Sequence, residues 1–177
     1  MTAPTLTPAL LDPGRWIVDA AASSLRLETT FRGLFALRGR FTQATGHLDV
    51  DDRVAGCRMH VDVATASLTT GSAARDAMLA AAGLVDPTAG PLLGFRSHRV
   101  VRRAAGLLVE GAVSTDRAVA PLRLAVELPR LSGGTTALRA WGRIPRKEIG
   151  ALLTRPGMEQ LLGPTAALNL TVAVHPS

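Results

Sequence analysis

The sequence predicts an all-β protein, built as a single extended antiparallel β-barrel of about eight strands with one or two short helices capping it. Apolar and polar residues alternate with a period of two over most of the chain, which is typical of strands with one buried face. The connections are hairpin-length and show no alternation of strands with helices, which indicates antiparallel pairing. Closing such a sheet removes exposed edges and leaves an interior for one small ligand. A β-sandwich fits the same alternating pattern and remains an alternative to the barrel.

Length and composition favour one folded domain. The chain has 177 residues, of which 47% are hydrophobic and 19% charged, and this balance excludes a disordered protein. We expect residues 1–13 to form a flexible lead-in and residues 14–177 to form the barrel domain. The lead-in has neither a basic start nor a continuous apolar stretch, so it does not resemble a secretory signal. No window approaches 18 apolar residues, so we expect no integral membrane segment and a cytoplasmic location.

Four strands are predicted in the first half of the chain. The clearest is 57–63, where every odd position is apolar and every even position is polar. Segment 24–32 places Leu25, Leu27 and Phe31 on one face. The other two predicted strands are 37–41 and 46–52.

A helix is predicted next, over residues 72–82. The segment is rich in alanine, Ser72 is a suitable N-cap, and Gly83 is a suitable stop. Strands then resume at 92–101, 107–113, 119–128, 136–144 and 165–175. Segment 146–162 is mixed, with helical turns around Glu148 and Met158.

The titratable residues do not predict an active site. Three strand histidines converging across a barrel would bind zinc, but His47 and His60 lie on polar strand faces. His98 and His175 lie on two further predicted strands. Asp76 is either a general base or, with Arg75, a charge pair that ties the helix to the barrel rim. The second interpretation is favoured because no nucleophile or second carboxylate lies beside it. We therefore predict no catalytic residue, no metal and no cofactor.

The single cysteine and the many arginines have structural explanations. Cys57 alone excludes an intramolecular disulfide, and its predicted inward position makes it a small core residue. The net charge is +6, from 20 basic and 14 acidic side chains. The outward arginines could form a basic surface for RNA or anionic lipid, but Phe31, Phe41 and Phe95, which stacking on bases would need at the surface, are predicted to face inward. A solvated face is favoured, and we expect no nucleic-acid partner. These outward residues are Arg26, Arg32, Arg38, Arg40, Arg58 and Arg123.

The inward side chains form the candidate ligand site. They carry no charge, so a cavity among them favours a long apolar molecule by burial, at about 25 cal/mol per Å². The alternative is that the side chains fill the barrel and leave no cavity. The candidate ligand-binding residues are Leu25, Leu27, Phe31, Leu37, Phe41, Met59, Val61, Val63, Phe95, Leu124, Val126, Leu170 and Val172, with Leu48, Ala140 and Gly142 beside them.

Several short motifs, in order, resemble the YceI-like family from about Trp16 to Val174. Each motif is weak alone, and their order and spacing make the resemblance fairly specific. They are 15–19 (RWIVD), 37–41 (LRGRF), 67–71 (SLTTG) with Arg75, Asp76 and Leu79, 90–97 (GPLLGFRS), 109–111 (VEG) and 144–150 (IPRKEIG).

The resemblance implies a lipocalin-like barrel that holds a polyisoprenoid or an isoprenoid-quinone tail, with no established enzyme activity. The predicted function is therefore a non-enzymatic binding or carrier protein for a long apolar lipid. One alternative is a structural or stress-related interaction domain with a filled barrel. A hydrolytic or metal-dependent enzyme is a weaker one. Whether the protein is a homodimer stays open.

Overall fold

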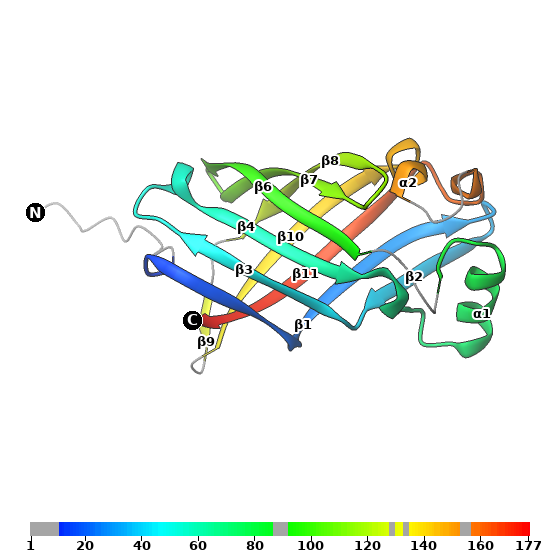
Figure 1. The fold of residues 1–177 in the computed structure, drawn as a ribbon, viewed down its shortest axis with the longest axis horizontal. Helices are drawn as coiled ribbons and strands as arrows, with labels where there is room; N and C mark the ends of the chain where they lie inside the picture. The colour runs from blue at the N-terminus through cyan, green and yellow to red at the C-terminus, as the bar shows by residue number, and fades with distance from the viewer. Residues whose placement is uncertain (1–10, 87–91, 128–129, 133–134, 153–156) are drawn as a thin grey trace, which may run out of the picture.

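Eight antiparallel strands close into a barrel in the computed structural model, which describes residues 11–86, 92–127, 130–132, 135–152 and 157–177 (Figure 1). Each strand pairs with the next around the ring, and the last pairs with the first, which closes the barrel. The predicted fold class is confirmed. In ring order the strands are β1 (Gly14–Phe31), β3 (Ala44–Val50), β4 (Arg58–Ala64), β6 (Leu92–Arg103), β7 (Gly106–Ser114), β8 (Val119–Val126), β10 (Thr135–Pro145) and β11 (Thr165–Pro176).

Strand β1 is longer than the sequence pattern predicts. Its first half pairs with β3, and its second half pairs with β2 (Phe35–Phe41). The pairing with β11 shifts register between Asp19 and Ser24, where the Asp19 carboxylate accepts hydrogen bonds from the Ala21 and Ala22 amides at 3.0 and 3.2 Å. This bulge interrupts the alternation, which is why the pattern marked only residues 24–32.

Two short strands extend the sheet beyond the ring. Strand β5 (Leu68–Thr69) pairs with β2, and β9 (Arg130–Ser132) pairs with β10. Neither was predicted, because two or three residues are too few to show a period. Strand β8 ends at Val126, and the last residue of the predicted strand 119–128 lies outside the described residues.

The helices gather at one end of the barrel. Helix α1 (Ala73–Ala81) begins as predicted, because the Ser72 hydroxyl accepts a hydrogen bond from the Arg75 amide at 3.4 Å, and Gly83 follows it with φ 73°. Helix α2 (Arg146–Leu152) continues directly from β10. Three 3-10 turns complete the elements: η1 (Val54–Gly56), η2 (Thr65–Ser67) and η3 (Met158–Leu161). Among the described residues, no helix has both the length and the apolar character needed to cross a bilayer.

The barrel therefore has two different ends. Helices α1 and α2 and the β1–β2 hairpin lie at one end, on the right of Figure 1, which we call the helix end. The start of β1 and the C-terminus lie toward the other, which we call the terminus end. Residues 1–10 of the predicted lead-in lie outside the described residues. Of the rest, Leu11 is buried, and the Asp12 carbonyl accepts a hydrogen bond from the Trp16 indole at 2.9 Å.

The predicted inward and outward faces are observed along β8. In β8 the burial alternates at every position: Leu122, Leu124 and Val126 are at most 5% exposed, while Arg123 and Ala125 between them are exposed. The main core fills the barrel. A second, smaller cluster packs under the helices and consists of Phe31, Leu37, Leu79, Leu84 and Leu162.

Candidate functional site: two apolar cavities in the barrel

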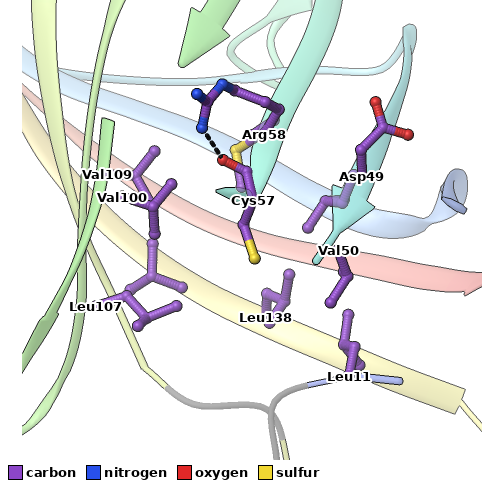
Figure 2. A pocket seen from close by; sticks show the side chains of 12 residues that line it. Leu11, Asp49, Val50, Cys57, Arg58, Val100, Leu107, Val109 and Leu138 are labelled. Carbon is purple, nitrogen blue, oxygen red and sulfur yellow. Dashed lines mark hydrogen bonds between the residues drawn. The ribbon is translucent and has the colours of Figure 1, made fainter. Parts of the chain in front are cut away.

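The barrel interior contains two separate cavities. The larger, which we call the helix-end cavity, measures about 140 Å³. The smaller, which we call the terminus-end cavity, measures about 60 Å³ and is shown in Figure 2. The helix-end cavity is lined by Leu27, Thr29, Leu37, Phe41, Thr65, Leu68, Leu79, Leu84, Val85, Leu93, Ile144, Ile149, Leu152, Leu162, Ala166 and Leu168. The terminus-end cavity is lined by Leu11, Leu48, Asp49, Val50, Cys57, Arg58, Met59, Val100, Leu107, Val109, Val126 and Leu138.

A belt of packed side chains lies between the two cavities. The order of the lining residues along a single strand shows this separation. On β10, Leu138 lines one cavity and Ile144 lines the other, while Ala140 between them lines neither. Because these strands run the length of the barrel, the belt divides the interior into two compartments. We define the central belt as Leu25, Val61, Phe95, Leu124, Ala140 and Val172, each at most 8% exposed.

The helix-end cavity is formed jointly by strands and helices. Helix α1 contributes Leu79, which is only 3% exposed, and α2 contributes Ile149 and Leu152. Of the described lining residues, only two are polar. Of these, the Thr29 hydroxyl donates to the Thr165 carbonyl at 2.9 Å, and Thr65 also has a partner. The described lining residues therefore present an apolar surface without a charged side chain, which suits an apolar molecule held by burial rather than by directed polar contacts.

Asp76 fastens α1 to the barrel rim. Its carboxylate accepts three hydrogen bonds, from the Thr70 amide at 2.8 Å, the Thr70 hydroxyl at 2.6 Å and the Thr69 hydroxyl at 2.8 Å. Because the Thr70 hydroxyl and amide, and then the Thr69 hydroxyl, stabilise the charged form, the pKa of Asp76 is lowered. Thr69 belongs to β5, which pairs with β2, so the helix is anchored to the sheet. This is the anchoring role that the sequence favoured over a general base, although the hydrogen bonds come from Thr69 and Thr70 and not from the predicted pair with Arg75.

Cys57 lies at the terminus-end cavity. Its side chain points toward Leu138 in Figure 2 and packs against the main core. The sulfur lies 3.8 Å from the carbonyl oxygens of Asp51 and Arg53. Cys57 is half-buried and lies just before β4, so the predicted inward position holds at the edge of the core.

Two of the histidines lie together on the outside of the barrel. The His47 and His60 rings face each other across β3 and β4, with centroids 4.9 Å apart. The His60 Nε2 atom lies 3.2 Å from the Asp62 carboxylate. Over the described ranges, no group of three or more potential ligand side chains has the geometry to hold a metal ion.

Ion pairs on the same outer face hold the pKa of two aspartates low. Arg15 binds Asp49 through two hydrogen bonds of 2.7 and 3.1 Å, and the first of these is the main cause of the lowered pKa of Asp49. Burial acts to raise the pKa of Asp62, but hydrogen bonds from Arg96 and His60 outweigh it, and that pKa is lowered too. These pairs are partly exposed and stabilise the outer surface rather than a reaction centre.

The thirteen predicted ligand-binding residues divide into four groups. Leu27, Leu37 and Phe41 line the helix-end cavity, and Met59 and Val126 line the terminus-end cavity. Phe31 is buried in the small cluster under the helices. The other seven line neither cavity and pack in or beside the central belt: Leu25, Val61, Val63, Phe95, Leu124, Leu170 and Val172.

Several lining residues lie outside the predicted strands. Leu79, Leu84, Ile149 and Leu152 come from the two helices and the segment after α1. A signal was present at two of them, because Leu79 and Leu84 are large apolar residues in an alanine-rich stretch. Ile149 and Leu152 fall in the mixed segment, which showed no period that would place them.

Comparisons with known proteins agree with this architecture. One solved structure, BcnA from Burkholderia cenocepacia, has a TM-score of 0.68 at 15% identity, covering 88% of this chain and 98% of that one. A polyisoprenoid binding domain from Saccharophagus degradans has a TM-score of 0.60 at 17% identity, covering 92% and 98%. The Campylobacter jejuni YCEI protein has a TM-score of 0.58 at 15% identity, covering 80% and 86%.

The sequence itself carries the family relationship. No curated protein matches the chain. The sequence model of the YceI-like domain matches residues 16–174, nearly the whole chain. The observed lipocalin-like barrel is the fold that this relationship implies. The chain therefore belongs to the YceI-like domain family.

Proposed function

We propose that this protein is a non-enzymatic carrier that binds a long apolar lipid, such as a polyisoprenoid or the tail of an isoprenoid quinone, inside the barrel. The observation that carries the proposal is the lining of the helix-end cavity, where fourteen of the sixteen described side chains are apolar and none of the sixteen is charged. Membership of the YceI-like family supports it. So does the fold shared with a domain described as polyisoprenoid binding.

The size of the cavity sets what it holds without rearrangement. A cavity of about 150 Å³ accommodates a benzene-sized group. At about 140 Å³, the helix-end cavity therefore holds about one five-carbon isoprene unit. A longer tail requires space from a neighbouring region, by outward movement of α1 or by separation of the central belt.

Burial supplies the binding energy. Each buried methylene contributes about 0.8 kcal/mol, so one isoprene unit of five carbons contributes about 4 kcal/mol before the cost of ordering the chain. Affinity should therefore rise with tail length until the available space is filled. A ligand selected in this way needs no specific head group inside the barrel.

The direct test is native mass spectrometry of freshly purified protein, together with organic extraction and lipid analysis. We expect a copurifying apolar lipid, and a mass shift when the stripped protein is mixed with isoprenoid quinones of increasing tail length. No copurifying lipid and no mass shift with any quinone would contradict the proposal.

A matched pair of variants locates the site. Leu168→Trp adds an indole ring to the helix-end cavity, and Leu107→Trp adds the same ring to the terminus-end cavity. We expect Leu168→Trp to lose quinone binding and Leu107→Trp to retain it. Circular dichroism and thermal melting establish that both variants are folded. The opposite result would place the ligand at the terminus end.

The filled-barrel interaction domain is the second candidate, and the central belt favours it, because packed side chains separate the two small cavities. A folded protein that takes up no quinone under any condition would support this candidate.

Cell fractionation tests the cytoplasmic location that we propose, and sedimentation velocity tests for a homodimer.

A further inference from the structure

The β1–β2 hairpin carries an exposed apolar tip at the helix end of the barrel (Figure 1). Leu34 is 79% exposed and Phe35 is 64% exposed. The turn before them is tight, because Arg32 and Gly33 have φ angles of 53° and 67°. Its base is fixed: the Arg32 amide donates to the Leu161 carbonyl at 2.6 Å. The tip is therefore a held projection and not a frayed end.

Other exposed apolar residues surround the same end. Met78 on α1, Leu92 at the start of β6 and Val119 at the start of β8 are 43%, 62% and 67% exposed. Strand β8 begins at the helix end, because its last residue, Val126, lines the terminus-end cavity. Of the six large hydrophobic side chains exposed within the described parts of the chain, five lie at this end. Concentration of this kind marks an interaction surface rather than scattered exposure.

The outer face of the same hairpin is basic. Arg26, Arg38 and Arg40 line a surface groove of about 650 Å³, with Glu28 as the acidic lining residue. Glu28 pairs with Arg38 at 3.3 Å. Arg26 and Arg40 lie directly opposite each other on β1 and β2, and like charges in that position destabilise a sheet unless an anion lies between them. The groove therefore has positive charge available for an external anion.

We propose that this hairpin docks the helix end onto the surface of an anionic phospholipid bilayer. Leu34 and Phe35 enter the boundary between headgroups and acyl chains, and the hairpin arginines contact the lipid phosphates. Arg38 lies three residues from Phe35, about 10 Å along the strand, which is the upper end of the depth of about 5 to 10 Å to which apolar side chains enter the headgroup boundary. Tilting the barrel onto the hairpin brings Arg26 and Arg40 to the same surface.

The combination of features selects a membrane over a protein partner. An apolar tip flanked by arginines matches both layers of an anionic bilayer, the acyl boundary and the phosphates. Docking here also places the helix-end cavity beside the lipid phase. The proposal goes beyond the carrier function, because binding to vesicles that contain no isoprenoid does not require the cavity.

The test is flotation of the full chain with vesicles of phosphatidylcholine alone and with vesicles containing phosphatidylglycerol. We expect binding to the anionic vesicles that weakens as salt is raised. Leu34→Ser/Phe35→Ser should reduce binding at least tenfold. Arg26→Gln/Arg40→Gln should reduce it about fivefold per arginine. The matched control is Arg102→Gln/Arg103→Gln at the terminus end of β6, which should bind like the unmodified protein.

Three outcomes would overturn the proposal. The first is no flotation of the unmodified protein, and the second is equal flotation of all variants. The third is a dimer that Leu34→Ser/Phe35→Ser converts to monomer without any vesicle binding, which would assign the tip to self-association. Uptake of detergent-solubilised quinone, measured in parallel, separates the two proposals. Vesicle binding without quinone uptake would support docking while it contradicts the carrier function.

Discussion

A substitution at Leu124 tests the packing of the central belt most directly. It is 2% exposed and lies between Leu122 and Val126 on the inner face of β8. Leu124→Ala removes three carbons, worth about 2.4 kcal/mol of transfer free energy, and leaves a void that adds about 1 kcal/mol or more. The free energy of unfolding should therefore fall by about 3 to 4 kcal/mol. For a protein of this length, that corresponds to a fall in Tm of roughly 6 to 16 °C.

The same substitution should change binding in the opposite direction. The new void lies between the two cavities, so it lengthens the space available to an apolar tail. We expect Leu124→Ala to take up a longer isoprenoid quinone than the unmodified protein does, in the native mass spectrometry assay. Val119→Ala, at a position 67% exposed on the same strand, is the matched control and should change the free energy of unfolding by less than about 0.5 kcal/mol.

Urea unfolding followed by circular dichroism measures the stability change. A loss below about 1 kcal/mol for Leu124→Ala would refute the packed belt. Shorter tails bound by a folded Leu124→Ala protein would refute the arrangement of two cavities separated by that belt.

Three further predictions follow from single contacts. Asp76→Asn should loosen α1 and raise amide hydrogen exchange there about fivefold, while β7 stays protected. Because the pKa of Asp76 is lowered in the folded protein, its stabilising contribution is present above the unfolded pKa of about 3.9 and is lost as pH falls through the folded pKa. Amide exchange of α1 in the unmodified protein should therefore also rise on acidification, and unchanged exchange would contradict the anchoring role. Gly142→Ala should lower the free energy of unfolding by about 1 to 3 kcal/mol, because an added Cβ would lie 2.8 Å from the Leu124 side chain and 2.9 Å from the Arg123 carbonyl oxygen. An unchanged melting temperature would show that β8 and β10 are less closely packed. Arg15→Gln should lower the melting temperature only slightly at low salt and not at all in high salt, since both side chains of the Arg15–Asp49 pair are largely exposed. A clear loss of stability that salt does not change would be inconsistent with a surface pair.

The fold was predictable because alternation fixes the face of each side chain. In segment 57–63 the odd residues pack in or against the main core, as the alternation predicts. Because the connections between consecutive strands are as short as hairpin turns, these strands pair antiparallel. The long β1 was only half predicted, because the bulge between Asp19 and Ser24 breaks the period that reveals a strand.

The cavities were less predictable than the fold. The alternating pattern predicts that Leu27 and Phe95 both point inward. It does not predict that Leu27 lines the helix-end cavity while Phe95 packs in the central belt. That difference depends on how side chains from several strands pack together, which no single strand encodes. The contributions of Ile149 and Leu152 depend in addition on where α2 lies against the barrel.

The most direct measurement of the central claim is cross-linking with an isoprenoid that carries a photoreactive group on its tail. The labelled peptides, identified by mass spectrometry, report which residues surround the bound chain. Binding in the helix-end cavity predicts labels at Leu84, Ile149 and Leu168 that disappear when excess unlabelled isoprenoid is added. Labels confined to the outer surface or to the residues around Leu107, or labels that competitor does not remove, would contradict it.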